Sequence, residues 1–175
     1  KNESRLMGHL HLSMQSGADP VLKRMARRHR QADLERIRDL LPNVALGADL
    51  IAGFPGETEA DHQTTLDVVE RLKLAHLHVF PYSARPGTPA ARWKGLKGDV
   101  VKARAAQLRA LGEANKASLM AGMIGQSVRV LVEEPGKGYC EAYLPVGFAG
   151  GEAGRIADIR LEDFENGLLR GRLIA

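Results

Sequence analysis

Polar side chains and glycines follow three apolar segments of the chain, at positions suited to binding a ligand. Ser13 and Gln15 end the first segment, Asp49 and residues 53–57 end the second, and residues 81–83 end the third. Glycine lets the backbone approach a ligand closely, and polar side chains there suit a ribose or an amino-acid group. Each glycine taken alone more often serves only to form a turn than to bind a ligand. Together, the three segment ends predict a small-molecule site.

The segments that would position these residues alternate between strand and helix patterns. Strands are predicted at residues 9–13, 44–52 and 75–81. Pro20 suits the first turn of a helix that ends before Pro42, and Thr58 with Asp61 three residues later is a capping-box variant that predicts a second helix. This β-α-β-α-β order predicts parallel strands with right-handed crossovers and helices on the outside. Ligands of such folds bind at the carboxyl ends of the strands.

A different pattern follows residue 98. Asp99 can cap a long, alanine-rich helix over residues 99–122. Beyond it, Val128, Val130 and Val132 alternate with larger polar or apolar residues, and short β-prone runs follow around residues 139–146, 155–161 and 168–174. The sequence therefore predicts an α/β domain over residues 1–123 and a small all-β module over residues 124–175.

Positive charge is concentrated in the first of these domains. Residues 1–126 carry 19 Lys and Arg against 13 Asp and Glu, whereas residues 127–175 carry 6 against 8. Basic stretches of this kind suit a phosphate backbone, although solvated helix faces are an equally good interpretation of the charge alone. The expected phosphate contacts are Arg27, Arg28, Arg30, Arg85, Arg92, Lys94 and Lys97.

The histidines and the one cysteine favour packing over metal chemistry. His9 and His11 lie on one face of a predicted strand, as do His76 and His78. No carboxylate or cysteine pattern completes either pair, so hydrogen-bonded histidines are favoured and no metal site is predicted. Cys140 is expected to fill a β core, and a single cysteine excludes an internal disulfide or a metal site built mainly from thiolates.

Four motifs, in this order and spacing, resemble those of the radical-SAM methylthiotransferases. They are His-Leu-His-Leu-Ser-Met-Gln-Ser-Gly at 9–17, Val-Leu-Lys-Arg-Met-x-Arg-Arg-His at 21–29, Ala-Asp-Leu-Ile-Ala-Gly-Phe-Pro-Gly-Glu-Thr-Glu at 48–59 and His-Val-Phe-Pro-Tyr-Ser-x-Arg-Pro-Gly-Thr-Pro-Ala at 78–90. The resemblance covers residues 9 to about 95 and is closest to the threonylcarbamoyladenosine-modifying branch. It implies the C-terminal half of a partial, TIM-like radical-SAM barrel, followed by an OB-like antiparallel β-barrel called the TRAM module.

The same resemblance implies S-adenosylmethionine (SAM) as a cofactor. Ser13 and Gln15 would contact its ribose or amino-acid part, and the guanidinium of Arg24 would meet its carboxylate in bidentate geometry. Asp49, Ile51 and Gly53 would belong to the adenine-contacting element, flanked by aromatic residues of the third strand. The implied cofactor-binding residues are Ser13, Gln15, Arg24, Asp49, Ile51, Gly53, Phe80 and Tyr82.

The 4Fe-4S clusters of that family have no ligands in this chain, which lacks the cysteine triad and has only Cys140. The resemblance thus implies that an N-terminal half of the same enzyme is missing here and is the partner of this part. The catalytic residues stay unknown, and the part taken alone is expected to be inactive. The expected function is to add a methylthio group to C2 of threonylcarbamoyladenosine in the tRNA anticodon stem-loop. Alternatives are the ribosomal-protein branch, the isopentenyladenosine branch and a non-catalytic RNA-binding module. Because no run approaches the roughly 20 apolar residues of a membrane span, a cytoplasmic location is expected.

Overall fold

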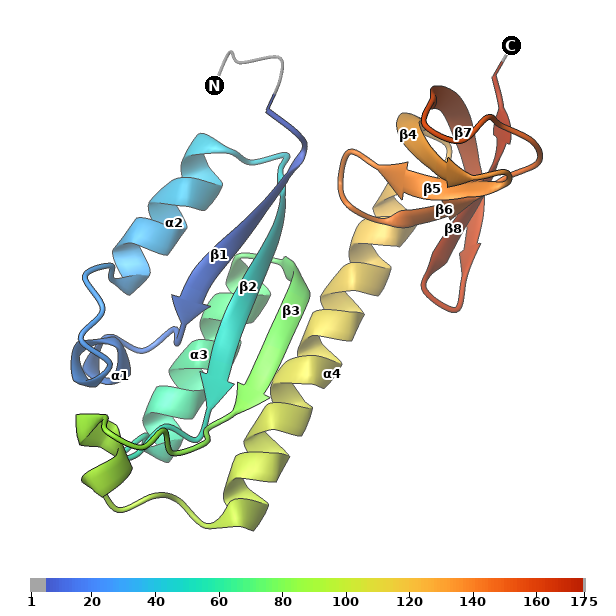
Figure 1. Cartoon of the computed structure of the whole chain (residues 1–175). Coiled ribbons are helices and arrows are strands. Elements are labelled where there is room, and N and C mark those ends of the chain that lie inside the picture. Colours follow the sequence, from blue (N-terminus) through green and yellow to red (C-terminus); the bar gives the residue numbers. More distant parts are fainter. Residues whose placement is uncertain (1–5, 175) are drawn as a thin grey trace. The chain divides into compact units, whose positions relative to one another are not determined.

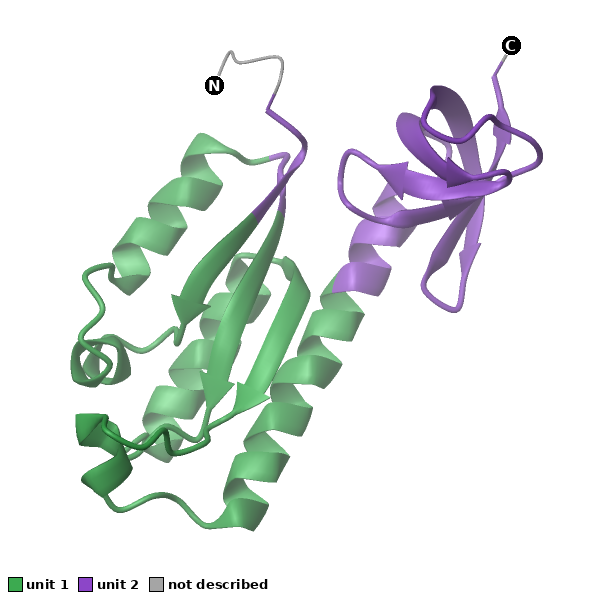
Figure 2. Cartoon of the chain, in the orientation of Figure 1, with its two compact units in different colours: residues 1, 11–42, 46–115 green, residues 2–10, 43–45, 116–175 purple. Residues whose placement is uncertain are grey.

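The computed structural model describes residues 6–174, which form two compact units (Figure 2). Among the described residues, the first unit comprises 11–42 and 46–115, and the second comprises 6–10, 43–45 and 116–174. None of the helices in these residues is long and apolar enough to cross a membrane.

The first unit alternates strands and helices around a three-stranded sheet (Figure 1). Its elements are β1 (His9–Gln15), α1 (Asp19–Arg24), α2 (Gln31–Leu40), β2 (Ala45–Ala52), α3 (Glu59–Arg71), β3 (Leu74–Pro81), the 3-10 helix η1 (Pro89–Arg92) and α4 (Gly98–Met123), whose last turns belong to the second unit. The strands lie in the order β1-β2-β3, and β2 and β3 run parallel. This arrangement confirms the α/β class expected from the sequence.

The two faces of this sheet differ in burial. Leu46, Ala48 and Leu50 of β2 are fully buried, together with Val68 and Val69 of α3. A strand this apolar on one face needs a helix against it, and α3 presents its own apolar stripe there. The alternate residues of the three strands are only partly buried or exposed: His11, Ser13, Asp49, Ile51, His78 and Phe80. Side chains able to do chemistry therefore lie on the open face.

The second unit is a closed five-stranded barrel with strand order β4-β5-β6-β8-β7. Its strands are β4 (Ser127–Glu134), β5 (Lys137–Cys140), β6 (Pro145–Gly147), β7 (Ile156–Glu165) and β8 (Leu168–Leu173). The sequence predicted an antiparallel barrel, whereas the observed barrel is mixed. β8 pairs antiparallel with β7 but parallel with β6, where Val146 is the partner of Leu169. Cys140 is buried in its core, as expected, and burial raises the pKa of its thiol.

Candidate functional site

A pocket of about 320 Å³ lies where β2 and β3 end. Its wall is formed by the last residue of α1 and those that follow it, by the ends of the two strands, and by the loop that leads into η1 together with η1 itself. Three arginines and three aromatic residues contribute most of its character: Arg24, Arg27, Arg85, Phe54, Tyr82 and Trp93. Such a wall combines flat apolar surfaces with positive charge, which suits a nucleobase attached to an anionic group.

The turn after β2 places Phe54 in this pocket. Gly53 and Gly56 have φ values of +77° and +80°, a region that glycine adopts without strain. A Cβ on Gly53 would also lie 2.6 Å from Cγ2 of Val101 on α4, so the helix packs directly on the turn. The backbone N–H of Gly53 donates to the Glu57 carboxylate at 2.9 Å, which closes the turn on itself.

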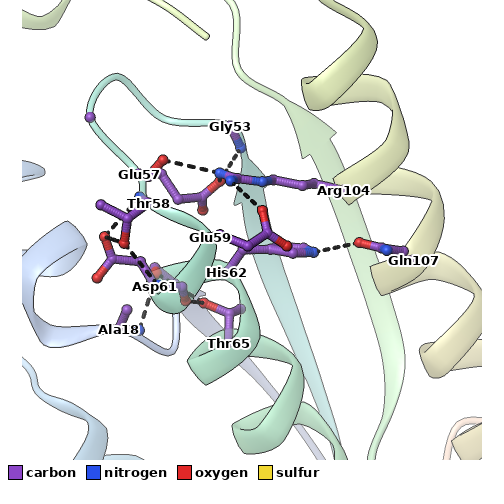
Figure 3. A network of polar contacts seen from close by, with 12 residues as sticks. Ala18, Gly53, Glu57, Thr58, Glu59, Asp61, His62, Thr65, Arg104 and Gln107 are labelled. Atoms are coloured by element: carbon purple, nitrogen blue, oxygen red, sulfur yellow. Dashed lines mark hydrogen bonds and ion pairs between the residues drawn. The ribbon is translucent and has the colours of Figure 1, made fainter. Parts of the chain in front are cut away.

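A buried ion pair ties this turn to α4 (Figure 3). Arg104 Nη1 donates to Glu57 Oε2 at 2.7 Å, and Arg104 Nη2 donates to Glu59 Oε2 at 2.8 Å. The side chains of Glu57 and Arg104 are only 2% and 7% exposed. Burial would lower the pKa of Arg104, but the hydrogen bonds to both glutamates outweigh it and raise that pKa above its ordinary value. The guanidinium therefore stays charged and holds the turn.

The helix that follows the turn begins as its sequence predicts. The Thr58 hydroxyl accepts from the Asp61 N–H at 3.1 Å, and the Asp61 carboxylate accepts from the Thr58 N–H at 2.9 Å. This reciprocal capping box fixes the start of α3. One turn later His62 pairs with Gln107 of α4 at 2.7 Å, a second link between the two helices (Figure 3).

Two polar groups in the pocket wall have bonding capacity suited to a ligand. Arg24 donates through Nη1 to the carbonyl of Gly56, but a guanidinium carries five N–H donors, so this bond does not exhaust it. The Tyr82 hydroxyl is buried and has no hydrogen-bond partner among the described residues. Leaving such a group unpaired costs about 1–3 kcal/mol. A ligand that pairs with this hydroxyl would recover that free energy.

The pocket brings together some of the residues expected from the sequence and leaves others apart. Arg24, Ile51 and Tyr82, expected at the cofactor, line it together with Arg27 and Arg85, expected at RNA. Other expected cofactor residues lie outside its wall: Ser13, Gln15, Asp49, Gly53 and Phe80. All seven basic residues expected at RNA are exposed. Phe54 lies within residues 53–57, the segment end expected at the site, although it was not named among the cofactor contacts. Trp93 was not expected in the pocket, and no pattern around it marks it.

Gln15 is unusual in its backbone conformation. It is 9% exposed and has a φ of +68°, which is uncommon for a residue with a side chain. The residues that follow are held in place, since the N–H of Gly17 donates to Oγ1 of Thr65 and a Cβ on Gly17 would lie 2.8 Å from the Thr65 Cα. Strain of this kind is concentrated at functional sites.

A second cluster occupies the open face of the sheet. Asp49 Oδ1 lies 2.9 Å from Nε2 of His11 and 3.2 Å from Nδ1 of His78. The hydrogen bond with His11 is the largest cause of a lowered pKa for Asp49, so this carboxyl is ionised. Asp49 contacts one histidine from each of the two same-strand pairs named in the sequence, because Asp49 and His78 are register partners on adjacent strands. Strand register cannot be read from spacing within one strand.

The fold is that of an α/β protein with a pocket at the ends of its strands, followed by a small β-barrel. No family model matches the chain. It is 39% identical over 168 residues to the tRNA-2-methylthio-N(6)-dimethylallyladenosine synthase of Paracoccus denitrificans, which covers 91% of this chain and 38% of that protein. It is 37% identical over 183 residues to the threonylcarbamoyladenosine tRNA methylthiotransferase of Thermotoga maritima, covering 98% and 42%.

A third relative, the threonylcarbamoyladenosine tRNA methylthiotransferase of Rickettsia prowazekii, is 42% identical over 146 residues, which are 81% of this chain and 35% of that protein. The chain belongs to the tRNA methylthiotransferase family, as its motifs indicated, and matches the C-terminal part of these proteins. It spans about two fifths of the length of the relatives it matches.

Proposed function

We propose that this chain is the SAM- and tRNA-binding part of an enzyme that adds a methylthio group to C2 of threonylcarbamoyladenosine. The observation that carries the proposal is the pocket, in which residues expected at the cofactor and residues expected at RNA share one wall. In the proposed arrangement the reacting nucleoside lies beside the cofactor.

SAM fits the donors and the surfaces of this pocket. The Arg24 guanidinium would bind the carboxylate of the methionine part, while Ile51 and the Phe54 ring would contact the adenine. The Tyr82 hydroxyl would pair with a polar atom of the ligand. The volume of about 320 Å³ lies at the lower end of the range for ligand pockets. When bound, one SAM molecule would supply the methyl group, and a second, after one-electron reduction, the radical that activates the nucleoside.

The family's 4Fe-4S clusters do not fit the residues of this chain. Such clusters are held by several thiolates, and Cys140 is the only cysteine and is buried in the barrel core. We therefore place the cluster ligands in an N-terminal half of the same enzyme, the proposed partner of this part.

The exposed cations of the first unit are the proposed contacts to the tRNA anticodon stem-loop. Arg27 and Arg85 stand at the pocket wall, so phosphates held there would direct a nucleoside toward the cofactor. The positive charge that Arg27 and Arg85 bring to the pocket wall also favours a substrate that carries its own carboxylate, as threonylcarbamoyladenosine does. An apolar dimethylallyl group, which the Paracoccus relative's name specifies, would form no ion pair with these arginines.

A titration of the chain with SAM tests the cofactor part of this proposal. Trp93 is the only tryptophan and lines the pocket, so its fluorescence reports on ligand entry. We expect a saturable change that weakens at least about tenfold in Arg24→Gln, because a charge-assisted pair is lost. Arg36→Gln, an exposed arginine of α2 outside the pocket, is the matched control. No change with SAM, or equal weakening in both variants, would contradict SAM binding here.

A further inference from the structure

We propose that His11, Asp49 and His78 form a binding site for one divalent transition-metal ion. The three residues come from β1, β2 and β3, which are neighbours in the sheet. Each offers one ligand atom, and these atoms all lie within 4.8 Å of one another. Two imidazoles and a carboxylate are a donor set suited to zinc, iron or nickel.

The distances match the edges of a coordination polyhedron. Zinc binds imidazole nitrogen at about 2.0–2.1 Å and carboxylate oxygen at about 2.0–2.2 Å, so ligand atoms of a tetrahedral site lie about 3.3 Å apart. The Asp49 oxygen lies 2.9 Å from the His11 nitrogen and 3.2 Å from the His78 nitrogen. The two imidazole nitrogens lie within 4.8 Å of each other, and His78 is exposed enough to turn toward a shared ion, with 66% of its side chain accessible.

The backbone beneath the cluster makes room for it. Gly47 lies two residues before Asp49 on β2, and a Cβ there would sit 2.7 Å from Nδ1 of His11. Glycine thus allows the His11 ring to lie over β2 and present Nε2 to Asp49. Because all three ligands stand on paired strands, the site is held by rigid elements, as a preformed metal site requires.

The site is open on one side, which indicates what a bound ion would do. The His11 and Asp49 side chains are 29% and 28% exposed. Three protein ligands leave at least one coordination position free, as in metal sites that bind a further ligand. Ile51 lies two residues after Asp49 on β2, which is about 6.6 Å along the strand, and it lines the pocket described above. An anionic oxygen of a carboxylate or phosphate at the pocket is the ligand class that such an ion would take.

The test uses the tag-free chain, stripped with a chelator and titrated with ZnCl₂ by calorimetry and with Co²⁺ by visible absorption. We expect one equivalent of metal per chain, reversible by chelator. Asp49→Asn and His78→Gln should each weaken binding at least about tenfold. Circular dichroism and Trp93 emission check that both variants keep the fold, which is expected because Asp49 and His78 are not core residues.

His76→Gln is the matched control, since His76 is the same-strand neighbour of His78 and stands outside the cluster. Its metal binding should equal that of the unchanged chain. Two results would overturn the site: no binding of either metal, or binding that survives Asp49→Asn and His78→Gln. The titration involves neither SAM nor tRNA, so its failure would leave the proposed function standing.

Discussion

Replacing Glu57 with glutamine removes one charge from the buried pair that holds the pocket turn to α4. Glutamine keeps the size and one acceptor oxygen, so the Gly53 N–H can still be satisfied. Arg104 would then face an amide at the position where it now meets a carboxylate at 2.7 Å. Breaking a buried pair from one side costs about 3–5 kcal/mol. Because Arg104 keeps Glu59, we expect a loss near the lower limit, about 3 kcal/mol.

Urea unfolding followed by Trp93 emission measures this loss in the first unit, to which Trp93 belongs. Glu59→Gln is the matched control: Glu59 meets the same guanidinium but is 81% exposed, so its loss should cost less than about 1 kcal/mol. If Glu57→Gln costs no more than Glu59→Gln, the buried pair does not stabilise the turn and the reasoning fails.

Four further predictions concern other contacts of the two units. Thr58→Ala should lower the free energy of unfolding by about 1 kcal/mol through loss of the α3 cap, and an unchanged urea midpoint would contradict it. Gly53→Ala should cost at least about 1 kcal/mol in the same assay, since a Cβ meets both a positive φ and Val101, and a neutral result would refute that. Leu161→Ala should cost about 2–5 kcal/mol in the barrel, measured by circular dichroism, whereas a loss under about 1 kcal/mol would show a core that collapses freely. Arg27→Gln combined with Arg85→Gln should make the slope of log K for tRNA binding against log salt concentration shallower by the equivalent of about two phosphate contacts. An unchanged slope would show that neither arginine contacts the RNA.

Much of the fold could be predicted because its signals are local. The capping residues Thr58 and Asp61 predicted where α3 begins, and their two reciprocal hydrogen bonds are observed. The long helix predicted over residues 99–122 is observed as Gly98–Met123. Hydrophobic patterns of this kind depend on neighbours three or four residues apart. The parallel closure of β6 on β8 was not predictable, because it depends on the path of the whole chain.

The site was harder to predict because its contacts join distant parts of the sequence. Arg104 lies 47 residues from Glu57, and no spacing rule connects them. The Asp49 cluster depends on strand register, whereas the sequence shows only the same-strand spacing of His76 and His78. Residue types at strand ends pointed to the edge of the sheet where this pocket lies, but only Arg24, Ile51 and Tyr82 of the expected cofactor residues share its wall. Which side chains share a wall is set by tertiary packing.

The proposed modification is tested most directly by mass spectrometry of tRNA nucleosides. A strain that lacks its methylthiotransferases would receive the full-length gene that contains this segment, either unchanged or with Arg24→Gln. We predict that 2-methylthio-threonylcarbamoyladenosine appears with the unchanged gene and falls strongly with the variant. A methylthio group on dimethylallyladenosine alone, or on neither nucleoside, would contradict the proposed function.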